Sequence, residues 1–476
     1  MSPDSRKRWL ALAVLCLGAL MIVLDTTIVN VALPSIRADL GFSETGLAWV
    51  VNAYMLAFGG FLLLGGRLGD LFGPRRLFLA GLAVFTLASL ACGLAPTKGF
   101  LIVARWVQGL GGAVVSAVSL SLMMSLFTEP AERAKAMGVF GFVCSGGGSL
   151  GVLLGGVLTG GFDWHWIFLV NIPVGAAVFA LSLWLLPGGK VPATGKLDVA
   201  GSVLVTASLL TAVYAVVGGN EAGWLSGRTL GLLGVAVALL GAFIVVESRV
   251  ASPLVPPNLL RIRNVAVSNV IGVLWAAAMF AWFFLSALYL QTVLGYTPLQ
   301  IGLSFLPANL IMAAFSIGIS AKLVMRFGLR APLAVGLLTA ALGLFLLGQA
   351  PTDGTFVRHV LPCMVLLGVG GGMAFNPLLL AAMSDVPQHE SGLASGIVNT
   401  AFMMGGALGL AVLASLASAR SHALTAAGSA PLDALTGGYN AAFIAGAGFA
   451  ATAGLLGLLL RKGNMDLSHG AGGHVG

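Results

Sequence analysis

Long apolar segments alternate with short polar ones along the whole chain. Each apolar segment has about 18 residues or more, enough to cross a hydrocarbon core about 30 Å thick at about 1.5 Å per helical residue. The segments lie at residues 9–33, 45–66, 77–95, 100–127, 135–158, 166–186, 198–217, 228–247, 265–291, 300–321, 331–350, 357–383, 392–417 and 439–460. The pattern therefore predicts an all-α integral membrane protein with 14 transmembrane helices.

The composition excludes a soluble fold and offers no cofactor site. Of 476 residues, 58% are hydrophobic and 8% are charged, whereas roughly a quarter of the residues in soluble domains are charged. The first apolar segment is longer than a signal-peptide core and lacks a small-residue cleavage site, so we expect a retained span. Neither the cysteines nor the histidines show metal-ligand spacing, so no disulfide, metal site or organic cofactor is predicted. The cysteines are Cys16, Cys92, Cys144 and Cys363.

The positions of Lys and Arg predict how the chain crosses the membrane. If the N-terminus is cytoplasmic, the cytoplasmic segments hold 18 of the 24 basic residues, the outer segments hold five, and Arg105 lies inside a span. Cytoplasmic loops of membrane proteins carry such an excess of positive charge. We therefore expect both termini in the cytoplasm. The net charge of +8 then reflects topology, and no nucleic-acid partner is predicted.

Two parts of the chain echo each other. TEPAERAKAMGVFGFV (residues 128–143) resembles DVPQHESGLASGIVNT (385–400), and GRLGDLFGPRR (66–76) has a weaker echo in AKLVMRFGLR (321–330). The echoes are six spans apart only if the seventh and eighth spans are set aside. We therefore predict an N-terminal six-helix bundle, a linker with two additional helices, a C-terminal six-helix bundle and a disordered cytoplasmic tail. Their bounds are residues 1–186, 187–263, 264–462 and 463–476. Such repeats are typical of secondary transporters.

Two charged residues lie deep within predicted spans. Asp25 is too far from either end of its span for its carboxylate to reach water, so it must face a cavity, pair with a cation or be protonated. Arg105 lies at a comparable depth in the fourth span and is the expected partner. Arg105, Gln108, Gly112, Ser116 and Ser119 share one polar and small face, which suits an aqueous cleft. The alternatives are a fold-stabilising acid and an arginine bound to backbone carbonyls.

The fifth span is rich in glycine. Gly147, Gly151 and Gly155 recur at four-residue steps beside Gly148 and Gly156. Small residues at this spacing let two helix backbones approach closely. Close packing is therefore expected, and the spacing leaves open whether the span is also a hinge or a seal against proton leak.

Four stretches carry a family resemblance that covers nearly the whole chain. LDTTIVNVALPSI (24–36), GRLGDLFGPRR, RWVQGLGGAVV (105–115) and the glycine run of span five resemble the signatures of the fourteen-span drug:proton antiporter branch of the major facilitator superfamily. One departure is Val152, which stands where the antiporter signature usually has proline. The resemblance implies alternating access and proton-driven efflux across a bacterial plasma membrane, with protons as the coupling ion.

The resemblance also implies roles for individual residues. Asp25 matches the protonatable acid and Arg105 the arginine linked to proton coupling. The implied gating loop comprises Gly66, Asp70, Gly73 and Arg75, with Arg133 as a partner, and the implied packing glycines are Gly147, Gly151, Gly155 and Gly156.

The predicted substrate is small and hydrophobic, either monocationic or aromatic, because the second half has no acid deep in a span. Aromatic rings in span nine can stack on such compounds, although rings facing lipid or a neighbouring helix are the commoner explanation. The candidate cavity residues are Asn30, Gln108, Trp275, Trp282, Phe283, Tyr289, Asn376 and Asn399. Other expected partners are membrane lipids, and a monomer is expected.

Two alternative functions stay open at this point. One is export of a single metabolite or lipid-like compound by the same machinery. The other is a membrane enzyme or sensor, against which the sequence shows no nucleophile and base pair, phosphate loop or metal cluster. The chain is therefore expected not to be an enzyme.

Overall fold

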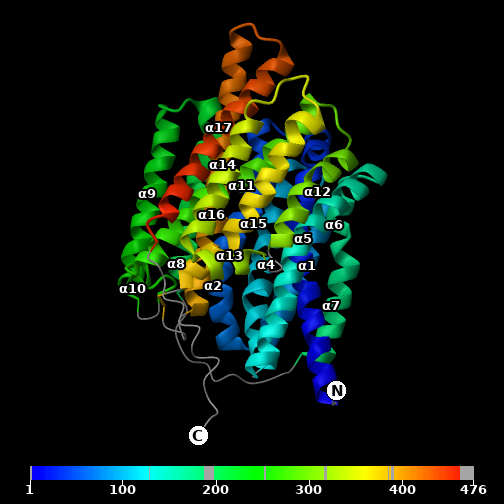
Figure 1. Cartoon of the computed structure of the whole chain (residues 1–476), viewed down its shortest axis with the longest axis vertical. Coiled ribbons are helices and arrows are strands. Elements are labelled where there is room, and N and C mark those ends of the chain that lie inside the picture. Colours follow the sequence, from blue (N-terminus) through cyan, green and yellow to red (C-terminus); the bar gives the residue numbers. More distant parts are fainter. Residues whose placement is uncertain are drawn as a thin grey trace.

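The computed structural model describes residues 3–127, 129–186, 198–250, 253–315, 319–383, 385–386 and 391–460, which form helices with no strand among them. The helices stand side by side in one bundle (Figure 1). α1 begins at the end drawn lowest in Figure 1, called the lower end here, and the opposite end is called the upper end.

The first part of the chain forms α1 (Pro3–Leu40), α2 (Glu44–Phe72), α3 (Pro74–Gly93), α4 (Lys98–Leu126), α5 (Pro130–Gly161), α6 (Trp166–Leu169) and α7 (Asn171–Leu185). Next come α8 (Val199–Ala222), α9 (Gly227–Glu247) and α10 (Pro257–Leu260). The remainder forms α11 (Arg263–Leu288), η1 (Tyr289–Val293), α12 (Pro298–Ala314), α13 (Ser320–Phe327), α14 (Arg330–Leu347), η3 (Phe356–Val360), α15 (Leu361–Met383), α16 (Ser391–Ala426) and α17 (Pro431–Gly457), where η1 and η3 are π-helical turns.

Within the described residues, 12 helical segments are long and apolar enough to span a membrane. They coincide with 12 of the predicted spans. The other two predicted spans, 135–158 and 300–321, fall on α5 and α12, whose shorter apolar stretches are Leu150–Gly161 and Pro298–Ala314. The chain is therefore an all-helical, multi-pass membrane protein.

Some helix boundaries differ from the predicted spans for local reasons. The predicted span 166–186 is broken after α6, because Pro173 has no N–H to donate to the carbonyl group four residues earlier. α16 continues to Ala426, and α17 already begins at Pro431. The spans predicted from hydropathy left out both of these helix ends, because the ends are polar. Pro431 is a signal for the start of α17, since proline is favoured at the first position of a helix.

Corresponding glycines occupy corresponding places in the two parts of the bundle. Gly73 ends α2 at φ 91°, and Gly328 ends α13 at φ 74°. A Cβ at Gly111 of α4 would lie 2.6 Å from Phe85 N, and a Cβ at Gly370 of α15 would lie 2.6 Å from Ala340 N. Only glycine tolerates such close backbone approach, so α3 packs on α4 as α14 packs on α15.

The pair α8 and α9 lies on one side of the bundle (Figure 1). α8 contacts both α2 and α16: a Cβ at Gly60 of α2 would collide with Thr206 Oγ1, and Ser415 Oγ of α16 donates to Val216 O at 3.1 Å. Ser208 Oγ of α8 donates to Ala236 O of α9 at 2.8 Å. α8 therefore lies where the first and last parts of the chain meet, with α9 outside it.

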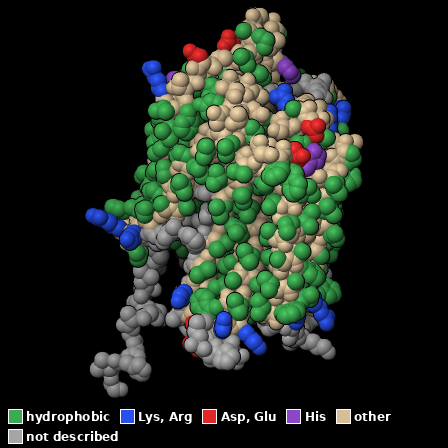
Figure 2. All heavy atoms as spheres, turned by 90° about the vertical axis from the view of Figure 1, so that its right-hand side faces the viewer, with side chains coloured by type: hydrophobic (Ala, Val, Ile, Leu, Met, Phe, Trp, Pro, Cys, Tyr) green, Lys and Arg blue, Asp and Glu red, His purple; other side chains and the backbone are tan. Residues whose placement is uncertain are grey.

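The outer surface suits a membrane. In Figure 2, hydrophobic side chains cover most of the middle of the visible face, and Lys and Arg lie mainly toward its two ends. α9 in particular exposes Leu230, Val235, Val237, Leu240 and Ile244. Apolar side chains on this scale would not be stable facing water.

Candidate functional site

Asp25 of α1 and Arg105 of α4 form a buried ion pair. Arg105 Nη1 lies 2.6 Å from Asp25 Oδ2, and both side chains are at most 1% exposed. Two charges without water need each other and further hydrogen bonds to offset the cost of desolvation. The expected pairing of Asp25 with Arg105 is therefore present in the geometry, while its role in proton coupling stays a prediction.

Four more groups hold the Arg105 guanidinium. Its Nε donates to Val50 O of α2 at 2.9 Å, and Nη1 also donates to Gln108 Oε1 at 2.6 Å. The ring of Tyr54 lies 4.4 Å and that of Phe168 5.5 Å from the guanidinium carbon, within the range of cation–π attraction. The positive charge is thus held by aromatic faces as well as by oxygen atoms.

The second oxygen of Asp25 accepts two amide donors. Gln108 Nε2 donates to Asp25 Oδ1 at 2.7 Å, and Asn171 Nδ2 donates to the same oxygen at 3.1 Å. Both amides also contact Ser89 Oγ of α3, at 2.7 Å from Gln108 and 3.4 Å from Asn171. Asp25, Ser89, Arg105, Gln108 and Asn171 are called the buried polar network from here on.

Ser89 and Asn171 were not among the predicted site residues. The available signal was that Asn171 is a lone amide at the start of an otherwise apolar helix. Gln108 was predicted to line the substrate cavity, and the structure places it in the buried polar network. Asn30, another predicted cavity residue, donates to the carbonyls of Thr26 and Thr27 in its own helix, at 3.2 and 3.4 Å.

Most of the polar face of α4 is buried in this structure, and its expected place beside an aqueous cleft stays a prediction. Arg105, Gln108 and Ser119 are fully buried. A Cβ at Gly109 would collide with Tyr54 O of α2, and one at Gly112 would lie 2.9 Å from Tyr54 Oη. The small residues of this face serve close helix packing, which excludes water from the ion pair.

The charged and amide side chains of this site occur in only one of the two related stretches of sequence. RWVQGLGG (105–112) of α4 corresponds in its glycine pattern to MVLLGVGG (364–371) of α15. Met364 and Leu367 stand where the first copy has Arg105 and Gln108. The glycines that permit packing occur in both copies, whereas the charged and amide groups occur only in the first.

The predicted packing glycines of α5 lie against two different helices. A Cβ at Gly151 would lie 3.0 Å from Leu24 O and one at Gly155 2.7 Å from Ile28 O, both on α1. Gly147 faces Leu20 and Val23 of the same helix. A Cβ at Gly156 would instead lie 2.9 Å from Pro298 O of α12. α5 therefore packs closely on α1 beside the segment that carries Asp25.

The predicted gating loop forms the turn between α2 and α3. Gly66 and Asp70 lie on α2, and Gly73 is the turn residue. Nη2 of Arg75 donates to Leu183 O near the end of α7. A cation there is favourable because helix C-termini carry negative partial charge. The side chains of Asp70 and Arg133 lie outside the described part of the structure, so their predicted contact stays a prediction.

The remaining predicted cavity residues are spread over α11, η1, α15 and α16. Trp275 and Trp282 are buried, and the Trp282 ring packs at 4.3 Å from Phe283 and 6.1 Å from Phe305 of α12. Tyr289 Oη donates to Pro351 O at 2.8 Å, which ties η1 to the loop after α14. Asn376 and Asn399 are partly buried on α15 and α16. Contact with a substrate stays a prediction for all of them.

A multi-pass helical bundle with an ion pair sealed among its spans is typical of polytopic membrane transporters. Residues 15–410 match the sequence model of the Major Facilitator Superfamily. The chain belongs to this superfamily.

Similar proteins are drug and antibiotic transporters. The chain is 41% identical over 449 residues to the puromycin resistance protein pur8 of Streptomyces alboniger, covering 92% of this chain and 88% of the relative. It is 41% identical over 413 residues to the cephamycin export protein CmcT of Amycolatopsis lactamdurans, covering 85% and 84%. It is 37% identical over 422 residues to the multidrug resistance protein Stp of Mycobacterium tuberculosis, covering 87% and 77%.

Solved structures share the fold at low sequence identity. An auto-inhibited POT family peptide transporter superposes with a TM-score of 0.68 at 15% identity, covering 96% of both chains. A bacterial homolog of the human lysosomal transporter Spinster superposes with a TM-score of 0.67 at 16% identity, covering 97% of both chains. The family and these relatives are transporters rather than enzymes.

Proposed function

We propose that this chain is a proton-coupled antiporter that exports small hydrophobic drugs or antibiotics across the plasma membrane by alternating access. The observation that carries the proposal is the ion pair of Asp25 and Arg105, which is fully buried in a bundle of apolar helices. Intramembrane ionisable residues are costly and mark ion pathways and proton relays in transporters. The resistance and export functions named for pur8, CmcT and Stp support a drug-like substrate.

The buried polar network suggests how a proton is exchanged. Protonation of Asp25 removes the charge that Arg105 neutralises, so the ion pair is weakened when a proton arrives. Arg105 keeps its bonds to Gln108 Oε1 and Val50 O, which satisfy two of its donors. Once α1 is released from α4, the bundle can change between its inward-open and outward-open states. The charge change at Asp25 shifts the equilibrium between these two states.

Alternating access requires contacts that close one end of the bundle at a time. At the upper end, a Cβ at Gly302 of α12 would lie 2.8 Å from Val152 O of α5, beside the contact of Gly156 with Pro298. These contacts join the first and last parts of the chain. They support a state closed at the upper end, where we place the outside.

We propose 14 spans, counting α5 and α12 with the 12 candidate segments. Both termini then lie in the cytoplasm, and α8 and α9 are an additional pair between two six-helix bundles. The proposed bounds are residues 1–186, 187–263 and 264–462, followed by a tail from 463 to 476 that lies outside the described residues. The protein acts as a monomer in a bacterial plasma membrane, with protons as the coupling ion and no other cofactor.

The test is reciprocal coupling in proteoliposomes that contain the purified protein and an internal pH dye. An imposed proton gradient should drive uptake of a lipophilic cationic dye into inside-out vesicles. When the dye is added without an imposed gradient, its entry into the vesicles should drive protons out of them. Transport at an unchanged rate after collapse of both the pH gradient and the membrane potential would contradict the proposal.

A second candidate is export of one dedicated compound by the same machinery. It is favoured by the names of pur8 and CmcT, which each refer to a single compound, in contrast to the multidrug name of Stp. A susceptibility panel in a host lacking other pumps separates the two. Resistance to one compound only indicates a dedicated exporter, and resistance to several unrelated compounds indicates multidrug efflux.

A further inference from the structure

Two buried carboxyl groups meet where α8 begins and α9 ends. Asp198 is the N-cap residue of α8 and Glu247 is the last residue of α9, and they are 4% and 5% exposed. A Cβ at Gly201 would lie 2.5 Å from Asp198 Oδ2 and 2.8 Å from Glu247 Oε1, so these two oxygens converge on one point. The two side chains are in hydrogen-bond contact. The pair α8 and α9 therefore carries buried acids of its own, apart from Asp25.

Backbone donors hold the other oxygen positions of these two groups. Asp198 Oδ1 accepts the Gly201 N–H at 2.7 Å and so caps α8. Glu247 Oε1 accepts the Leu254 N–H at 3.3 Å, and Oε2 accepts the Val255 N–H at 3.1 Å. Asp198 Oδ2 is buried and has no hydrogen-bond donor within the described part of the chain. Because buried polar atoms are nearly always hydrogen-bonded, a proton between the two carboxyl groups would supply the missing donor.

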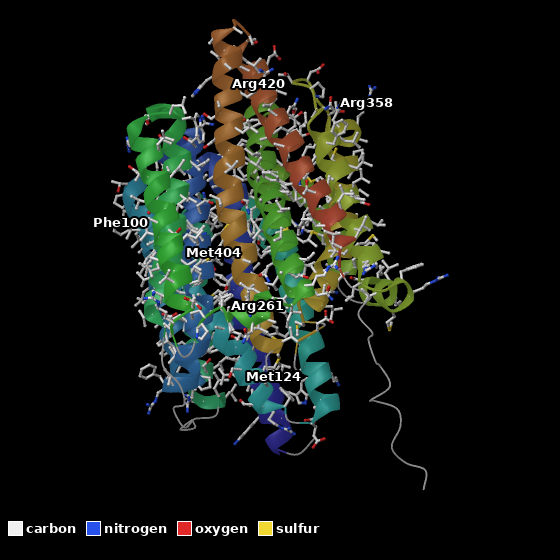
Figure 3. All side chains as sticks on the ribbon, turned by 90° about the vertical axis from the view of Figure 1, so that its left-hand side faces the viewer. Phe100, Met124, Arg261, Arg358, Met404 and Arg420 are labelled. Atoms are coloured by element: carbon white, nitrogen blue, oxygen red, sulfur yellow. The ribbon has the colours of Figure 1, made fainter. Side chains whose placement is uncertain are left out.

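The charged groups around the two acids are basic residues that point into solvent or side chains that lie outside the described structure. The exposed basic residues that follow Glu247 are Arg249, Arg261 and Arg263, and Arg261 lies below the middle of the bundle (Figure 3). The charged side chains of the lower half of α2, and of the segments before α8 and α16, are outside the described structure; they are Arg67, Asp70, Lys190, Lys196, His389 and Glu390.

Among the described residues, neither Asp198 nor Glu247 takes part in an ion pair. Two carboxylates in contact without a cation cannot both be ionised, because like charges at this distance disfavour each other's charged form. The pair then titrates as one unit that holds a proton between its two members.

We propose that Asp198 and Glu247 form a second proton-binding site, outside the buried polar network, and hold one shared proton. The site lies at the lower end of α8 and α9, where α10 follows (Figure 1). The shared proton keeps Glu247 where it accepts from Leu254 and Val255, and so ties the segment that leads to α10 and α11 to the end of α9. This site goes beyond the proposed antiport and does not depend on Asp25.

The direction of the pH effect follows from the charges. At low pH the proton is present and the segment after α9 is held. As the pH on that side of the membrane rises, the proton leaves to water and two adjacent negative charges remain. Their repulsion separates the two carboxylates and frees the segment.

The experiment measures backbone hydrogen exchange of residues 253–262 in the full-length protein in nanodiscs, with labelling times scaled to the intrinsic exchange rates. The samples are compared at about pH 6 and about pH 8.5, a range in which isolated carboxyl groups no longer titrate. Protection of the wild-type segment should fall at least about tenfold at the higher pH, because the repulsion of two adjacent charges exceeds the free energy of one factor of ten.

Glu247→Gln replaces the shared proton with an amide. The Gln side chain donates to Asp198 Oδ2 and accepts a backbone N–H at any pH, so protection should be high at both pH values. Asp198→Asn should act in the same way from the other side, since asparagine also caps a helix. Either variant is sufficient if the other does not fold.

The matched control is Glu132→Gln. Glu132 is a partly exposed acid of α5 whose Oε2 pairs with Arg8 Nη1 at 2.9 Å. Its loss should leave the pH response of residues 253–262 unchanged.

A metal arm tests the other occupant that a pair of carboxylates could bind, a divalent cation. Removal of divalent cations with a chelator should leave the wild-type protection at the lower pH intact. Loss of that protection on chelation would assign the pair to a cation and overturn the proposal. The proposal is also overturned if the wild-type segment shows no pH response, or if both variants keep the response of the wild type.

Discussion

Asn171 Nδ2 lies 3.1 Å from Asp25 Oδ1 and so ties the first turn of α7 to the middle of α1. Gln108 donates to the same oxygen, while Arg105 contacts the other oxygen. The carboxylate is therefore held on both sides by groups from α4 and α7. The Asp25 carboxylate is therefore held in one orientation. A fixed orientation suits a proton carrier, because the carboxylate then either pairs with Arg105 or binds a proton.

Replacing Asp25 with Asn should abolish coupling and also reduce stability. Asp25→Asn leaves Arg105 buried with no counter-charge, and breaking a buried pair in this way costs about 3–5 kcal/mol. We expect efflux driven by a pH gradient to be lost in inverted vesicles at equal expression, and the unfolding temperature in detergent to fall.

The control for that variant is Asp25→Asn/Arg105→Gln, which removes both charges. It should recover part of the lost stability without recovering coupling. Full gradient-driven efflux in Asp25→Asn would remove Asp25 from the coupling role.

Replacing Asn171 with Ala should slow coupled transport. The variant removes one hydrogen bond to a charged group, worth about 1.5–3 kcal/mol, and it also leaves Ser89 with one amide neighbour fewer. We expect the efflux rate to fall about tenfold or more, by the usual conversion of 1.4 kcal/mol per factor of ten.

Asn30→Ala is the matched control. Asn30 is a buried amide as Asn171 is, but it lies on α1 and donates to carbonyls of its own helix. Its efflux rate should change much less. Equal losses in the two variants would show that Asn171 acts through general packing.

The spans and the ion pair were predictable from the sequence, but the full network was not. An apolar run longer than the hydrocarbon core has few alternatives to a helix, and two opposite charges at equal depth in such runs have strong reason to meet. Neutral amides carry no comparable constraint, since an amide can be satisfied by its own helix. Asn30 and Asn171 look alike in sequence, and only the tertiary contacts distinguish them.

The glycines of α5 give a prediction about packing. Gly151→Ala places a Cβ 3.0 Å from Leu24 O and against Thr27 Oγ1 of α1, so the two helices must separate. Overpacking of this kind costs about 1–3 kcal/mol. We expect a lower unfolding temperature and slower efflux. Gly218→Ala on α8 is the control, because a Cβ there meets nothing within 4 Å; the substitution should be neutral or stabilising, since Ala favours helix more than Gly does.

The position of α8 predicts how the additional pair moves. Thr206 lies so close to the Gly60 backbone that α8 cannot slide along α2, whereas Ser415 Oγ of α16 contacts α8 through a hydrogen bond to Val216 O, which can break and re-form. We therefore expect α8 to move with α2 while α16 moves past it. The rings of Trp49 of α2 and Tyr214 of α8 lie 6.4 Å apart, and cysteines at these two positions, bridged by a short thiol reagent, should leave efflux largely intact. Cysteines at positions 415 and 216, bridged in the same way, should stop it, and reduction should restore it where the bridge is a disulfide. Equal inhibition by both bridges would mean that α8 is fixed to neither part, because each bridge would then block a motion that the transport cycle requires.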